Sequence, residues 1–332
     1  MTKHAAKPYK PTVMRRHSLL PILAIATAAL IALLALGCGD DSEPASDESP
    51  LTLLQTAAGK KIDSAKVQIR AAADIPGFPI LGDRLSLTAT GPVAMDADGA
   101  PALDLDAMLR AGGQAFPTRI TAVDGDVYVD FQGLSYQVDP EMLAMLPLGH
   151  GKGSAKQGAT SLKSLGIDPS DWLTNAKVED GEDIGGDSTR LITGTVDEQA
   201  VLADVLKAAD SPAARDQIEK SGDAAKGLPE LNEENLDKVA EAIEKVSVEV
   251  NVDDDGYARR LYASLRFKMP EDIKNAAYEG GTVSFELIFD EIGGVTVNVA
   301  PPANPRPLSD LFDFAGVIFG VDELSDLWTS PL

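Results

Sequence analysis

The sequence is poor in the residues that most enzymes and metal sites use. It holds one cysteine, Cys38, and three histidines in 332 residues. A single cysteine excludes an intrachain disulfide, and zinc sites draw on several His or Cys ligands that this chain does not have. The one histidine beyond the leader, His150, lies in a glycine-rich loop with no Gly-x-Ser-x-Gly nucleophile motif nearby. We therefore predict that the protein is not an enzyme and has no metal site and no cofactor.

Positive charge is also scarce. The chain has 29 basic and 52 acidic residues, a net charge of −23. Residues 1–37 hold five of the basic residues and no acid, so the remainder carries a net charge of −28. Nucleic acid and anionic lipid surfaces repel such a chain. We expect no nucleic-acid partner, and a stability that comes from a packed core.

One long apolar run is present, from Ser18 to Cys38 (SLLPILAIATAALIALLALGC), and Arg15 and Arg16 precede it. A basic segment, an apolar run and a small-residue end predict an export signal over residues 1–37. Its last four residues, Ala-Leu-Gly-Cys, resemble the bacterial lipobox, whose cysteine is acylated and becomes the new N-terminus. The alternative is an uncleaved signal anchor, because about 20 apolar residues can span a bilayer.

The segment after Cys38, GDDSEPASDESP, contains five acids and no base. Residues 38–50 are therefore predicted to be a lipidated cysteine and a disordered tether. Twelve extended residues reach at most about 40 Å, which keeps the folded part near its membrane. We expect a cell-membrane protein, anchored through the acylated Cys38 on the extracytoplasmic face.

Alternating apolar and polar residues predict antiparallel strands in two groups. The first group lies at 66–71, 85–90, 103–107, 120–122 and 127–131, and the second at 246–252, 261–267, 283–289 and 295–299. A hairpin is predicted between them, over 178–197. The prolines from Pro301 to Pro307 are expected to end the sheet.

Helical spacing is found at 51–58, in short segments at 140–149 and 161–175, and after the predicted caps Asp197 and Asn232, the latter helix reaching Ile243. The order of sheet, helices and sheet predicts an α+β fold with helices packed on one face of a curved sheet. The pattern leaves open whether this is one domain or two.

Three stretches carry a resemblance to a known family: Ala122 to Asp139, Leu191 to Asp197, and the paired strands of 247–267 and 283–302. With the single-cysteine signal and the acidic tether, they resemble the LppX/LprAFG-type bacterial lipoproteins, a family similar in fold to LolA and LolB. The resemblance implies an α+β domain over residues 51–307, with a strongly curved antiparallel β-sheet (an open, LolA-like half-barrel) and helices packed on its concave face. Members carry lipids, glycolipids or acylated proteins within the envelope.

Physical chemistry makes such a function intelligible, because an apolar sheet face that helices do not fill can bury an acyl chain. At roughly 0.8 kcal/mol per CH₂, a C16 chain contributes about 12 kcal/mol before costs. The candidate cavity-wall residues are Val127, Val129, Phe131, Val248, Val250, Leu265, Phe267, Phe285, Leu287 and Phe289. For any single one of them, an ordinary core position is the simpler interpretation.

We therefore expect a membrane-anchored lipoprotein that binds a lipid, glycolipid or acyl-chain ligand and carries it within the envelope. A transporter or a second lipoprotein is the expected partner. The alternative is a non-enzymatic interaction or sensor module with the same fold and a filled core. A solvent-accessible apolar cavity distinguishes the two.

Three further segments have more than one interpretation. The loop 149–158 lacks the spacing of a phosphate-binding loop. Residues 251–256 match the first half of a calcium loop, but Tyr262 stands where the bidentate glutamate belongs, so a hairpin turn is predicted. The apolar segment 308–332 is predicted to be a C-terminal helix that docks on the core, covers the cavity, or contacts a membrane or partner.

Overall fold

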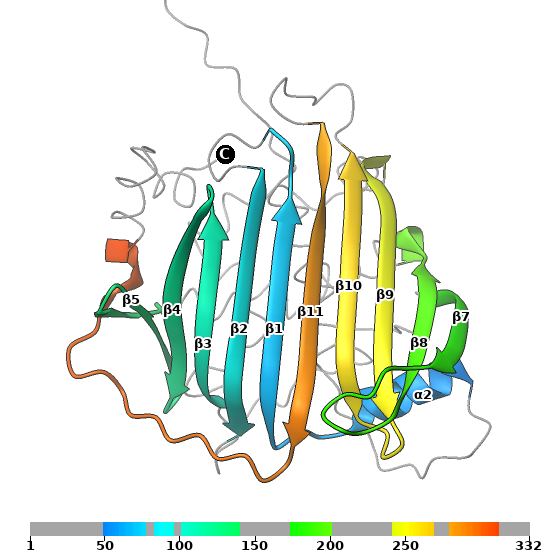
Figure 1. Cartoon of the computed structure of the whole chain (residues 1–332), viewed down its shortest axis with the longest axis horizontal. Coiled ribbons are helices and arrows are strands. Elements are labelled where there is room, and N and C mark those ends of the chain that lie inside the picture. The colour runs from blue at the N-terminus through cyan, green and yellow to red at the C-terminus, as the bar shows by residue number, and fades with distance from the viewer. Residues whose placement is uncertain are drawn as a thin grey trace, which may run out of the picture.

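The described part of the protein is a single sheet of twelve strands (Figure 1). This computed structural model describes residues 49–77, 83–95, 101–139, 173–200, 241–268 and 279–311. One helix, α2 (Pro50–Gly59), precedes the strands. The strands are β1 (Ser64–Asp74), β2 (Arg84–Met95), β3 (Pro101–Ala111), β4 (Gln114–Val123), β5 (Asp126–Phe131), β6 (Leu134–Gln137), β7 (Leu173–Asp180), β8 (Thr189–Val196), β9 (Ile243–Asp253), β10 (Ala258–Lys268), β11 (Gly280–Ile292) and β12 (Arg306–Pro307).

The two predicted groups of strands join into one sheet through the pairing of β1 with β11. The strand order is β12-β6-β5-β4-β3-β2-β1-β11-β10-β9-β8-β7, with β12 and β7 at opposite edges, so the sheet is open. All neighbours are antiparallel except β12 and β6. The described residues are therefore mostly β, and the strong curvature and the helices on a concave face stay predictions.

The pairing register divides the side chains between two faces. Leu287 of β11 lies opposite Ile69 of β1 and Leu261 of β10, and Ile69 lies opposite Ala89 of β2. Positions that share this face from β5 to β9 are almost all Gly, Ala, Val, Ile, Leu or Phe, and we call it the apolar face. The positions between them, such as Glu286, form the polar face.

Helix α2 packs against one end of the apolar face. Ser49 caps it, because the Ser49 hydroxyl accepts a hydrogen bond from the Thr52 amide at 3.3 Å. Leu53 and Ala57 are buried in the core cluster that also contains Val248 and Val250. The helix predicted over 51–58 is thus confirmed, and it covers the part of the sheet formed by β7 and β9.

Several elements differ from the sequence prediction in their type or in their bounds. The segment 295–299 is not a strand, because β11 already pairs on both sides with β1 and β10 and offers it no edge. Residues 173–175 are strand and not helix: the Leu173 side chain lies against Gly194 of β8, where a Cβ would be 2.5 Å from it. Ile243 begins β9, where it pairs with Phe267 across a bulge. Pro307 does not lie beyond the sheet, since it pairs with Gln137 in β12.

Other predictions lie outside the described residues. They concern the signal over 1–37, Cys38 and most of its tether, the segments at 140–172 and 201–240, and residues 312–332. Asp197 lies within the described residues. Its carboxylate accepts a hydrogen bond from the Ala200 amide at 3.0 Å, as predicted for a helix cap. Within the described ranges, no helix has the length and hydrophobicity needed to cross a bilayer.

Candidate functional site

All ten candidate cavity-wall residues lie on the apolar face. The register places Val127, Val129 and Phe131 of β5 opposite Ala122, Ile120 and Thr118 of β4, and carries the face on through β3, β2 and β1 to β11 and β9. Strict alternation is what the sequence shows, and the structure adds that the strands pair in a register that keeps these positions together. The residues differ, however, in what covers them.

Four candidates belong to a filled core. Val248, Val250, Leu265 and Phe267 are 9%, 3%, 5% and 3% exposed and share a cluster with the α2 residues. Side chains buried to this degree pack against protein atoms on every side. At the β8–β10 end of the sheet, the ordinary core position is therefore the better interpretation.

The β5 candidates are half-buried, and the start of the C-terminal segment lies over them. Leu308 is 7% exposed and clusters with Tyr136 and Val138, against which Val127, Val129 and Phe131 pack. Leu311 joins the same cluster. Residues 308–311 thus make the contact that a docking C-terminal segment requires, and they occupy the β5–β6 end of the apolar face.

The β11 candidates lie in the middle of the sheet and are half-buried. Phe285, Leu287 and Phe289 share this part of the face with Ile69 and Ala71 of β1 and Leu87 of β2, all half-buried. We call these six residues the central apolar patch. Phe285 is flanked in the register by the two small residues Ala71 and Ala263, and it lies outside all three buried clusters. A large ring thus lies between two small residues in the middle of the apolar face.

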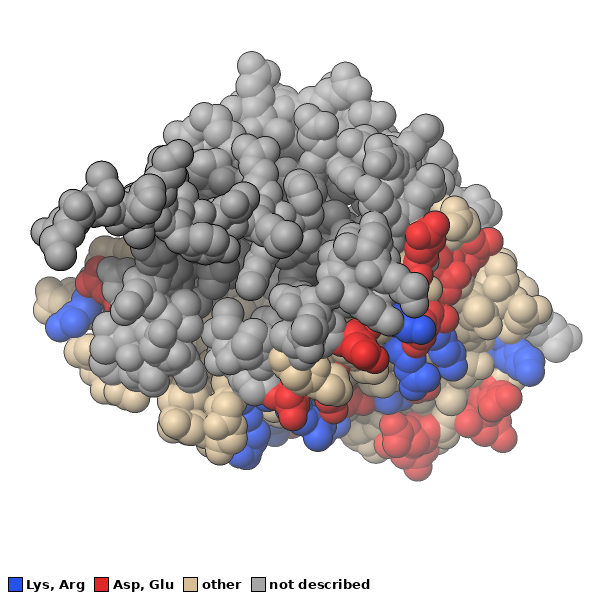
Figure 2. All heavy atoms as spheres, turned by 90° about the horizontal axis from the view of Figure 1, so that it is seen from above, with Lys and Arg blue, Asp and Glu red and all other residues tan. Residues whose placement is uncertain are grey.

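The polar face is organised by ion pairs that cross strands β9, β10, β11 and β1. Figure 2 shows basic and acidic side chains interspersed along one side of the described residues. At their centre, the Glu286 carboxylate accepts hydrogen bonds from Arg70 at 2.6 Å and from Arg260 at 2.7 Å. Arg260 also donates to Glu249 at 3.1 Å. Burial by itself raises the pKa of Glu286, but the hydrogen bonds from Arg260 and Arg70 outweigh it and bring the pKa below its usual range.

A pH-dependent contribution to stability follows from this lowered pKa. Glu286 stabilises the folded state above its unfolded pKa of about 4.3, and the contribution is lost as the pH falls through the lower folded value. We expect Glu286→Gln to lower the melting temperature at pH 7, and the difference from the wild type to shrink steadily below about pH 4. The melting temperatures of the wild type and of Glu286→Gln are measured by circular dichroism at intervals from pH 7 to pH 3. A difference that stays constant with pH would contradict the assignment.

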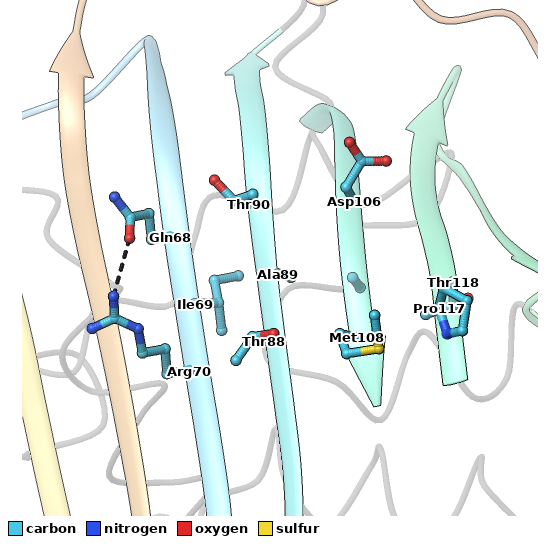
Figure 3. Close-up of a pocket in the computed structure, with 11 residues that line it drawn as sticks. Gln68, Ile69, Arg70, Thr88, Ala89, Thr90, Asp106, Met108, Pro117 and Thr118 are labelled. Carbon is cyan, nitrogen blue, oxygen red and sulfur yellow. Dashed lines mark hydrogen bonds between the residues drawn. The ribbon is translucent and has the colours of Figure 1, made fainter. Parts of the chain in front are cut away.

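A shallow hollow lies on the polar face over β1 to β4 (Figure 3). Its volume is about 520 Å³, and Gln68, Arg70, Thr88, Thr90 and Asp106 are among the residues that line it. Arg70 donates a hydrogen bond to Gln68 at 3.3 Å, in addition to its pair with Glu286. Thr88, Thr90, Arg70 and Asp106 are exposed. Because its charged groups are either paired or in contact with solvent, the hollow presents no desolvated group to a ligand.

The residues that match half of a calcium loop form the β9–β10 turn, so the hairpin prediction is confirmed. The Asp253 carboxylate accepts hydrogen bonds from the Tyr257 amide at 2.8 Å and from Arg259 Nε at 2.5 Å. Its two oxygens are thus used to hold the hairpin. Sequence reasoning missed Arg259, which is 7% exposed and sits at a bulge of β10.

Comparison with known proteins gives structural matches alone. No family model and no curated protein sequence matches the chain. Among solved structures, the crystal structure of LprF from Mycobacterium bovis is 14% identical and covers 77% of this chain and 97% of its own, with a TM-score of 0.37. The Mycobacterium tuberculosis lipoprotein LppX is 17% identical and covers 75% of this chain and 98% of its own, with a TM-score of 0.35.

A third match is MucB in complex with MucA(peri), at 9% identity and a TM-score of 0.26, covering 77% of this chain and 58% of MucB. LprF and LppX belong to the LppX/LprAFG-type group that the sequence resembles, so the structural neighbours include the group expected. Because these three TM-scores are below 0.5, the function is inferred from the residues of this chain.

Proposed function

We propose that this chain is a lipid-anchored, extracytoplasmic lipoprotein that binds the acyl chain of a lipid or glycolipid on the central apolar patch and carries it within the cell envelope. The observation that supports it most is the half-buried state of Phe285, Leu287 and Phe289 in the middle of a twelve-stranded sheet. Phe and Leu are among the residues most often fully buried in a folded protein. Here the three β11 side chains are only half-buried, whereas Val67 and Leu265 on the neighbouring strands β1 and β10 are 3% and 5% exposed.

The anchor is the acylated Cys38, and the partners are the membrane, the lipid ligand and a transporter or second lipoprotein that exchanges it. The proposed activity is binding and transfer, with no covalent chemistry. The filled-core alternative, a lipid-anchored interaction module, is favoured by one observation: the β8–β10 end of the apolar face is fully packed. The same experiment separates the two proposals.

The experiment is native mass spectrometry of the full chain extracted from the membranes of the expressing cells. We expect discrete adducts of lipid mass that organic extraction removes. Acyl groups on Cys38 remain after extraction, because they are covalent, and so do not confuse the result. A single mass that does not change on extraction, with no uptake from a mixed-lipid suspension, would replace the carrier with the interaction module.

A further inference from the structure

A continuous row of apolar side chains crosses the sheet from β4 to β11. Its members, each opposite the next in the pairing register, are Phe116 of β4, Leu109 of β3, Leu87 of β2, Ala71 of β1 and Phe285 of β11. We call them the apolar row, and the last three also belong to the central apolar patch. All five are half-buried, whereas Ala263 and Val248, which continue the line in β10 and β9, are 4% and 9% exposed.

The C-terminal segment meets the sheet at the β4 end of the apolar row. The ring centroids of Phe116 and Phe131 are 6.0 Å apart, and Phe131 packs against the cluster that contains Leu308. Leu308 begins a helical turn in which Leu311 is half-buried against the same cluster and Asp310 is exposed. One side of this turn therefore faces the sheet and the other faces solvent.

The sequence repeats this division beyond the described residues. Positions three and four residues apart share one side of a helix. A helix that continues from Leu308 and Leu311 would carry on the same side Phe312, Ala315, Ile318 and Phe319. The segment 308–332 also contains five acidic residues and no basic one, so an anionic membrane surface repels it. The apolar row is the better partner for this side of the helix.

The segment is long enough to reach the central apolar patch. From Leu308 to Phe319 a helix rises about 16 Å, and the three interstrand spacings from β5 to β2 amount to about 14 Å. Phe319 can therefore reach Leu87, the member of the patch nearest to β5. As a helix, residues 320–332 add about 20 Å, which is more than the two spacings from β2 to β11.

We propose that residues 312–332 lie along the apolar row as a helix and cover the central apolar patch until a lipid displaces them. The inference rests on the proposed lipid-binding function, because it describes how that same site is regulated. In the empty protein the segment keeps water from the patch, as expected of proteins that rarely expose large apolar surfaces. The helix and an acyl chain compete for the patch, so the apparent affinity for lipid falls with the fraction of molecules in which the patch is open.

The direct test is photo-cross-linking of the full chain in phosphatidylcholine nanodiscs. In the variant Phe319→p-benzoylphenylalanine, the reactive group replaces a ring of similar shape. We expect cross-links to β2, β3 or β4 of the same chain, mapped by peptide mass spectrometry, and their loss when a pyrene-labelled 16-carbon fatty acid is added. Cross-links to phosphatidylcholine or to a second copy of the chain would overturn the inference in favour of a membrane contact or a dimer.

Two aspartate variants, one residue apart, test the competition. Ile318→Asp places a charge on the side that continues from Leu308, and Val317→Asp places it on the opposite side of the helix. Burial of an isoleucine favours the docked state by roughly tenfold or more. We expect Ile318→Asp to bind the fatty acid about tenfold more tightly than the wild type, by pyrene fluorescence, and Val317→Asp to bind it as the wild type does.

The two experiments together separate this inference from the function on which it rests. Equal affinities in the wild type, Ile318→Asp and Val317→Asp overturn the inference and leave the lipid-binding function standing. Cross-links to the sheet without fatty-acid uptake by any of the three proteins overturn the proposed function, and displacement by lipid with it.

Discussion

Replacing Phe285 with aspartate should abolish lipid binding and leave the sheet folded. The ring lies on the central apolar patch between Ala71 and Ala263, outside the buried clusters. Loss of the contact between an acyl chain and a phenyl ring weakens binding by about 1.5–3 kcal/mol. A carboxylate beneath the chain adds the cost of burying an unpaired charge. We expect affinity to fall more than about 100-fold, which corresponds to about 2.8 kcal/mol, as measured by lipid adducts in native mass spectrometry.

The matched control for Phe285→Asp is Ser284→Asp. Ser284 is the preceding residue on β11, is also half-buried, and by the register lies on the polar face opposite Ser264 and Ala72. The two variants add the same charge one residue apart on opposite faces. Equal loss of lipid binding in both variants, or unchanged binding in Phe285→Asp, would show that the ligand does not lie on the apolar face.

Replacing Arg259 should cause the largest loss of stability among single changes to the described charged residues. Arg259 donates to Asp253 at 2.5 Å, pairs with Asp187 at 2.5 Å, and donates to the Asp290 carbonyl at 3.0 Å. The side chains of Arg259 and Asp253 are 8% and 3% exposed. Arg259→Met leaves the Asp253 carboxylate buried without its cation, which costs about 3–5 kcal/mol. Urea unfolding at pH 7 measures the change.

Two further variants test that reason. Arg266→Met removes an exposed arginine seven residues along the same strand and should change the free energy of unfolding by less than about 0.5 kcal/mol. Adding Asp253→Asn to Arg259→Met removes the unpaired charge and keeps an oxygen for the Tyr257 amide, so part of the loss should return. If the double variant is no more stable than Arg259→Met alone, the buried charge is not the cause.

Local patterns in the sequence identified most of the strands and their faces. The alternation Val246-Val248-Val250 and Leu261-Ala263-Leu265 reflects one covered face, and a strand with a period of two keeps that face wherever it pairs. The turns at Asp124-Gly125 and Asp254 to Gly256 are equally local, because few residues adopt the left-handed backbone seen at Asp124, Gly125 and Gly256. These features depend on near neighbours alone, so a single sequence determines them.

Long-range pairing decided what the sequence left open. The contact of β1 with β11 joins residues more than 200 positions apart, makes one sheet from two groups of strands, and removes the edge that 295–299 would have needed. Bulges in β10 and β11 set the positions of Arg259 and Asp290, whose contact crosses between strands. No local pattern encodes a register shift, because it is fixed by the strand on the other side.

The candidate site, too, has features that the local sequence fixes and features that tertiary packing fixes. The sequence by itself determined that ten apolar residues would share a face, since alternation is written into each strand. Only the tertiary structure decided that four of them are packed under α2, that three lie beneath Leu308 and Leu311, and that Phe285, Leu287 and Phe289 remain half-buried at the centre. Burial depends on what packs against a residue from elsewhere in the chain, so the pattern of a single strand does not determine it.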